Sequence, residues 1–100
     1  MDVPVACSLE ADDARAQLGE WHDLLTTNVD HARRVAPGRL DLVLRSDADV
    51  GAVARLAQRE AACCGFFTFT VEVLPTSLIL AIEVPDDAAP ILDQFAAIAS

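Results

Sequence analysis

Three cysteines, Cys7, Cys63 and Cys64, are the residues whose types and spacing suggest a chemical function. Cys63 and Cys64 are adjacent, and Glu60 precedes them by three and four positions. On a helix, these spacings place side chains on one face, so the sequence predicts a carboxylate beside two thiols. Thiolates bind soft metal ions, and they also act as nucleophiles. The two chemistries need different electrostatic surroundings.

The predicted position of the Cys63–Cys64 pair, at the end of a helix, favours metal binding over covalent catalysis. A helix C-terminus carries partial negative charge, and Glu60 adds to it, so both raise the pKa expected for these thiols. A nucleophilic cysteine needs a lowered pKa. A bound metal ion supplies its own positive charge and deprotonates the thiols. The sequence therefore does not favour an enzyme.

Cys7 is the third candidate ligand. It stands just before a predicted helix start, where the dipole lowers a thiol pKa and the acidic residues that follow partly cancel the effect. The sequence does not decide whether Cys7 approaches Cys63 and Cys64. Three converging thiolates would suit Hg(II) or a similarly soft metal or metalloid ion rather than calcium or magnesium. The paired C-x-x-C spacing of structural zinc sites is missing.

The same cysteines also fit a purely structural role. A free cysteine is a small, often buried hydrophobe, and Ala61-Ala62-Cys63-Cys64 has the composition of a small-residue packing surface. In that case the chain is a non-catalytic ligand-sensing or protein-interaction module. Both readings stay open at this point.

Other polar residues give weaker signals. His22 and His31 are isolated in the sequence, which is typical of surface histidines rather than ligands. Arg33, Arg34 and Arg39 flank a predicted hairpin turn and are expected to form a solvated face, with a site for an anion or an acidic partner as the alternative. The sequence contains no phosphate loop, dinucleotide fingerprint or Ser-His-Asp pattern to argue from.

The composition limits which classes of binding partner and which cellular compartment are expected. The 100 residues are 53% hydrophobic and carry a net charge of −9, with seven arginines as the basic residues. This charge disfavours nucleic acid and anionic membrane surfaces as partners. We expect neither a signal peptide nor a membrane span, and hence a cytoplasmic, reducing location in which thiols stay reduced. The oligomeric state is left open, a homodimer included.

Periodicity predicts one α+β domain over residues 1–100. Alternating apolar residues predict five strands, and spacings of three and four predict three helices. The order is β-α-β-β-α-β-β-α, a two-layer arrangement of a five-stranded, largely antiparallel sheet with the helices mainly on one face. The predicted strands are 3–7, 29–35, 39–44, 67–73 and 78–84.

Capping residues set the predicted helix bounds. The first helix runs from an N-cap at Ser8 to residues 26–28, and the second from an N-cap at Ser46, with Asp49 three positions on, to Gly65 at C′. The third begins at Asp86 or Asp87, with Pro90 in its first turn. Proline and glycine at 37 and 38 predict the first hairpin turn. The predicted core is Trp21, Leu40, Leu42, Phe67, Phe69, Val71, Leu80 and Ile82. Val73 is expected on the same buried strand face as Phe67, Phe69 and Val71.

The run from Glu60 to Phe69, E-x-x-C-C-x-F-F-T-F, resembles the mark of a small family of bacterial domains. Cys7-Ser8-Leu9 and Glu20-Trp21 resemble the same family, so the likeness extends over essentially the whole chain. Such domains occur alone or attached to regulators of the mercury-resistance (MerR) type. The resemblance implies thiol-dependent sensing or binding of a soft metal or metalloid ion, in the context of stress resistance. No helix-turn-helix region is evident in the sequence, so DNA binding is not implied.

Overall fold

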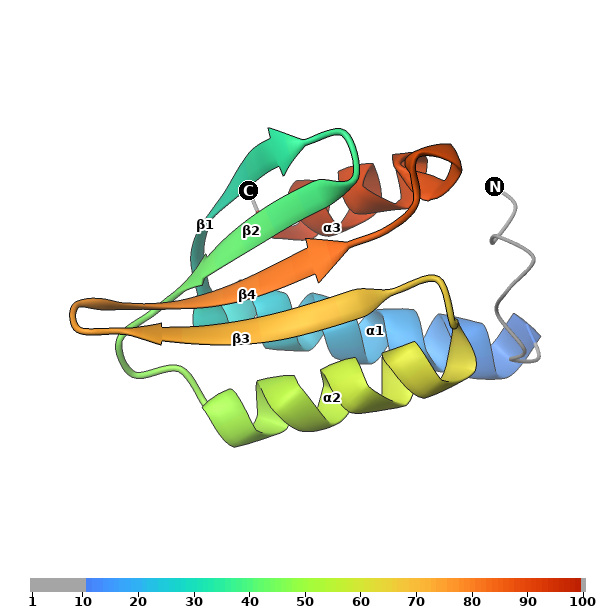
Figure 1. Ribbon diagram of the computed structural model, residues 1–100. Helices are drawn as coiled ribbons and strands as arrows, with labels where there is room; N and C mark the ends of the chain where they lie inside the picture. Colours follow the sequence, from blue (N-terminus) through green and yellow to red (C-terminus); the bar gives the residue numbers. More distant parts are fainter. Residues whose placement is uncertain (1–10, 100) are drawn as a thin grey trace.

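A computed structural model describes residues 11–99, except for the side chains of residues 11–18 and of Cys63. The described residues form a four-stranded antiparallel sheet in the order β1-β2-β4-β3, three α-helices and a short 3₁₀ turn (Figure 1). The α+β class is confirmed, and the predicted strand over residues 3–7 lies outside the described residues. The elements are α1 (Ala11–Asn28), β1 (Val29–Ala36), β2 (Arg39–Leu44), α2 (Val50–Cys63), β3 (Thr68–Leu74), β4 (Ser77–Glu83), η1 (Asp86–Ala88) and α3 (Pro90–Ala99).

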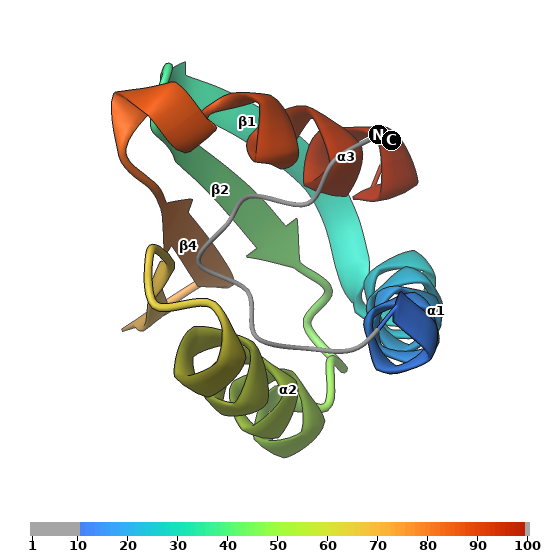
Figure 2. The same cartoon turned by 90° about the vertical axis from the view of Figure 1, so that its right-hand side faces the viewer.

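The three helices cover one face of the sheet (Figure 2). Because β2 and β3 both pair antiparallel with β4, they run in the same direction on either side of it. Helix α2 connects β2 to β3, the two strands that flank β4. None of the helices within residues 11–99 combines the length and apolar character needed to cross a bilayer.

The core lies between the sheet and the helices. The alternation of leucine in β2 is confirmed, since Leu40, Leu42 and Leu44 are buried and face the helices in register with β4. The predicted inward face of β3 is only partly correct. Phe69 and Val71 are half-buried, and Val73 is 74% exposed, because the end of β3 runs beyond the helical layer.

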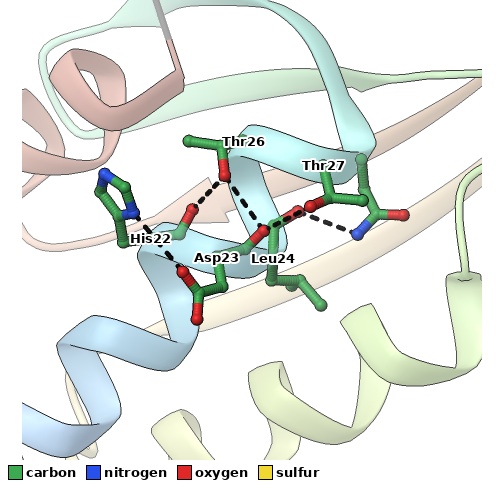
Figure 3. A network of polar contacts seen from close by, with 6 residues as sticks. His22, Asp23, Leu24, Thr26 and Thr27 are labelled. Atoms are coloured by element: carbon green, nitrogen blue, oxygen red, sulfur yellow. Dashed lines mark hydrogen bonds and ion pairs between the residues drawn. The ribbon is translucent and has the colours of Figure 1, made fainter.

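The side chains in the last turn of α1 bond back to carbonyls of the preceding turn (Figure 3). Thr26 Oγ1 donates to the carbonyls of His22 and Asp23, at 2.9 and 3.1 Å, and Thr27 Oγ1 donates to the carbonyl of Asp23 at 2.8 Å. Asn28 Nδ2 donates to the carbonyl of Leu24 at 2.9 Å. Such local bonds from Thr and Asn side chains to carbonyls three and four positions back compete with continuation of a helix, as expected for a terminus at residues 26–28.

Asn28 also fixes the start of α2, which differs from the prediction. Its side-chain oxygen accepts the backbone N–H of Asp49 at 2.9 Å, and Asp49 Oδ1 accepts the N–H of Ala52 at 3.0 Å. The N-cap is therefore Asp49, and the prediction of Ser46 was wrong. At the other end Gly65 follows the C-cap, Cys64, but it does not take the positive φ that favours glycine at C′.

Gly38 is required by a close approach rather than by its φ angle, which is not positive. A Cβ at this position would lie 2.5 Å from the carbonyl oxygen of Val84. The Val84 N–H donates to the Gly38 carbonyl at 2.9 Å, so the end of β4 packs tightly against the β1–β2 turn. Beyond it, both Asp86 and Asp87 lie in η1, so neither is the N-cap of α3, which begins at Pro90.

The face of the sheet turned away from the helices is covered by its own charged side chains. Arg39, on β2, donates from Nε to Asp41 at 2.9 Å and reaches Glu72 on β3 at 3.4 Å. It therefore crosses the intervening strand β4, where the 1% exposed Ala81 leaves room for it. The hydrogen bond that Arg39 donates to Asp41, and then the negative charge of Asp41, hold the pKa of the Arg39 guanidinium above its ordinary value.

Candidate functional site

All five aromatic residues of the chain gather in one cluster around the start of β3. Trp21 of α1 stacks on Phe69 with ring centroids 5.7 Å apart, and it meets Phe95 of α3 edge-on at 5.1 Å. Phe67 lies between Phe66, Phe69 and Phe95, with centroids at 4.5, 5.2 and 5.8 Å. The F-F-T-F run therefore supplies three rings to a water-excluding layer that links α1, β3 and α3.

Glu60 is a buried carboxylate at the rim of this cluster. Its side chain is on α2, is 8% exposed and accepts the indole N–H of Trp21 at 2.7 Å. The neighbouring positions repeat the link, because Arg59 of α2 forms an ion pair with Glu20 of α1. Two consecutive residues on α1 thus bind two consecutive residues on α2. The Trp21–Glu60 contact is buried, and the Glu20–Arg59 contact is exposed.

Cys64 lies directly after the last turn of α2 and is 2% exposed within the core. Its backbone N–H donates to the Glu60 carbonyl at 2.8 Å, and its own carbonyl accepts the N–H of Phe67 at 3.2 Å. The backbone is extended at Cys64 (φ −123°, ψ 91°), whereas Cys63 is the last helical residue. The chain therefore leaves the helix between the two cysteines. Cys64 is buried, as predicted, but it is the extended residue after α2 and does not lie on a helix face.

The predicted grouping of Glu60 with the two thiols is thus seen only in part. Cys64 and Glu60 belong to one buried turn, while the Cys63 side chain and Cys7 lie outside the described residues. The Glu60 carboxylate is bonded to Trp21. Within the described part of the chain, no three His, Cys, Asp or Glu side chains come together as a metal site.

The histidines and arginines are found at the surface. His22 and His31 are exposed, as predicted, and each lies beside an adjacent aspartate. Arg34 donates to Asp93 of α3 at 2.7 Å and to the carbonyl of Ala89, just before α3, at 3.2 Å. Among the predicted arginines, Arg34 and Arg39 thus hold elements of this chain together rather than forming a free anion site.

The Trp21–Glu60 contact is the feature that the sequence reasoning missed. Trp21 was expected in the core, and Glu60 was considered only beside the cysteines. The signal available in the sequence is that a tryptophan with a buried ring needs an acceptor for its N–H. A carboxylate on the buried side of another amphipathic helix is such an acceptor.

Comparison with known proteins identified no relative of this chain. No family model matches the sequence, and neither a curated protein nor a solved structure matches it.

Proposed function

We propose that this chain is a small thiol-dependent binding protein for a soft metal or metalloid ion, acting in sensing or sequestration in a reducing, cytoplasmic environment. The donors are Cys63 and Cys64, with Cys7 as a third ligand. The observation that carries the proposal is the position of Cys64, a thiol that is 2% exposed and directly follows a second cysteine at the end of α2.

Burial of a donor thiol favours retention of a metal ion in the presence of other thiols. A competing small thiol must reach the ion to displace it, and the aromatic layer that contains Phe66 and Phe67 begins two residues after Cys64 in the chain. A site whose donors are already positioned also loses less entropy when it binds. Hg(II) or a similarly thiophilic ion is the ligand class that suits such donors.

A second candidate function is favoured by the surroundings of the same residue. Cys64 belongs to the hydrophobic cluster that contains Val53, Leu56 and Phe67, and Glu60 is bonded to Trp21. These contacts suit a non-catalytic ligand-sensing or interaction module in which the cysteines are packing residues. The first function requires the thiols to bind a metal ion, whereas the second does not.

Competition against excess glutathione separates them. Reduced protein is loaded with one equivalent of Hg(II), and metal retention is followed by mass spectrometry and by the fluorescence of Trp21, the single tryptophan. Wild type should retain the ion, while Cys63→Ser and Cys64→Ser should lose it. Cys64→Ala is the matched control, because it removes the thiol without burying a hydroxyl in its place. If wild type and all variants lose the ion alike, the cysteines are packing residues.

Cys7→Ser determines the number of ligands. If this variant also loses Hg(II) to glutathione, the site has three thiolates, and arsenite or antimonite becomes a ligand to test in the same assay. Retention by Cys7→Ser leaves a two-coordinate site at Cys63 and Cys64.

A further inference from the structure

The two edges of the described sheet differ in how they are protected. Strand β1 carries Asp30, His31, Arg33 and Arg34, and its pairing with β2 is interrupted by two register shifts. Strand β3 pairs with β4 in an unbroken register, contains no proline, and has Glu72 as its only charged residue. Charges and bulges are the usual devices that keep a sheet edge from pairing with another strand, so β1 has them and β3 lacks most of them.

The outer edge of β3 also carries incompletely covered apolar side chains. Phe69 and Val71 are half-buried on the helical face, and Val73 follows them on that face with 74% exposure. Leu74, on the opposite face, is 44% exposed. Within residues 11–99, no strand pairs with this edge. Every second residue of β3 turns its backbone N–H and C=O away from β4, so the edge presents a row of hydrogen-bonding groups.

We propose that β3 pairs antiparallel with β3 of a second copy of this chain, so that the two four-stranded sheets form one continuous sheet. The pairing is centred on Val71, which faces itself across the two-fold axis. In this register, Val73 lies beside Phe69 of the other copy, and Thr70 lies beside Glu72. The proposal rests on β3 alone and is independent of the cysteines.

The sequence of β3 is self-complementary in this register and not in the neighbouring ones. Val73, the most exposed apolar residue, gains an aromatic cross-strand neighbour, a favourable kind of pair. A register centred on Glu72 would place the two carboxylates opposite each other, which is unfavourable. A register centred on Thr70 would place Val73 opposite Phe67, which is already buried before β3 begins.

The size and charge of the interface determine its expected strength. Seven-residue strands bury less than the roughly 1,600 Å² of a standard stable interface, although α2 packs against β3 and would flank the new strand pair. Each copy carries a net charge of −9, so the copies repel each other at low salt. The dimer should therefore be weak, concentration-dependent and strengthened by added salt.

Sedimentation velocity of the full chain, under reducing conditions and from about 10 μM to 1 mM, tests the proposal. Wild type should shift from monomer to dimer with concentration. Val73→Lys should raise the dissociation constant about tenfold or more, because it places a charge against Phe69 of the other copy. Val35→Lys is the matched control, since Val35 is a 53% exposed valine on the β1 edge, and it should leave the equilibrium unchanged.

Thr70 tests the register. Thr70→Arg places two new opposite-charge pairs with Glu72 across the axis and should tighten the dimer, and Thr70→Glu should weaken it. Far-ultraviolet circular dichroism checks that each variant is folded. A wild-type chain that stays monomeric at 1 mM overturns the proposal, as does a dimer that Val35→Lys weakens as much as Val73→Lys. Equal effects of Thr70→Arg and Thr70→Glu overturn the register.

Discussion

Trp21 and Glu60 come from different helices, and the Trp21 indole N–H donates to Glu60 Oε1 at 2.7 Å in the interior. Both side chains are buried, at 1% and 8% exposure. The indole N–H and the carboxylate therefore satisfy each other, and leaving either one buried without a partner would destabilise the fold. The contact fixes α1 against α2 beside the turn that holds Cys64.

Removing both partners of this pair should cost less than the sum of the costs of removing each one alone. Trp21→Phe keeps most of the ring but leaves the Glu60 carboxylate without the indole, and we expect a loss of about 2–3 kcal/mol in the free energy of unfolding. Trp21→Phe combined with Glu60→Met should be less destabilising than the sum of the single changes. Urea denaturation followed by circular dichroism measures all three. Strict additivity would show that the hydrogen bond contributes nothing.

Phe69 should contribute much more to stability than Val73, two positions further along the same face of β3. Phe69 stacks between Trp21 and Phe67, so Phe69→Ala should cost about 3 kcal/mol. Val73 is 74% exposed, and Val73→Ala should cost less than about 0.5 kcal/mol. Denaturant unfolding of the two variants gives the comparison. Similar losses would mean that the inward face of β3 is assigned incorrectly.

Two glycines should respond to alanine in opposite directions. At Gly38 the new Cβ would lie 2.5 Å from the Val84 carbonyl oxygen, so Gly38→Ala should lower the thermal midpoint by displacing the end of β4. At Gly19, inside α1, nothing lies within 4 Å of the new Cβ. Gly19→Ala should therefore stabilise the protein by about 0.5–1 kcal/mol. Calorimetry of both variants provides the test, and destabilisation by Gly19→Ala would contradict it.

The contribution of Arg39 to stability should not depend on pH near neutrality. Its hydrogen bond to Asp41 holds the Arg39 pKa above the ordinary value. A group with a raised pKa stabilises the fold at every pH below its ordinary pKa, and the effect is lost only as pH rises through the raised value. The drop in thermal midpoint caused by Arg39→Met should thus be the same from about pH 6 to pH 10. A drop that disappears within this window would be inconsistent with the pairing.

Duplex DNA should not bind to this chain at about 0.1 M salt. The net charge is −9, and two of the arginines that flank the first hairpin, Arg34 and Arg39, are paired with Asp93 and Asp41. A gel-shift assay with random duplex checks this, with Arg33→Ala as the variant to examine if a salt-sensitive shift appears. Such a shift in wild type would contradict the prediction.

Regular patterns in the sequence predicted the three α-helices and the four described strands, and much of the core. The alternation of Leu40, Leu42 and Leu44 and of Leu80 and Ile82 gave the buried face of the two central strands, because both strands are covered along their length. The same alternation misled at Val73. Periodicity assigns a side chain to a face, but it does not say where the helices covering that face end.

Contacts between distant segments could not be predicted in the same way. Ser46 and Asp49 are both good N-cap residues, and the choice of Asp49 is associated with the Asn28 side chain, which binds the Asp49 N–H from the end of α1. Likewise, the pairing of Glu60 with Trp21 depends on how α1 and α2 cross. The burial of Cys64 was predicted from helix spacing, although Cys64 is the extended residue that follows α2.

The placement of β4 between β2 and β3 has a consequence for folding kinetics. The β1–β2 and β3–β4 pairs are hairpins of neighbouring segments, whereas the central β2–β4 pair joins segments separated by the whole of α2 and β3. Closing that long loop costs chain entropy before its contacts form. The docking of the two hairpins should therefore limit the refolding rate, and substitutions in the β2–β4 seam should slow refolding more than substitutions at the hairpin turns.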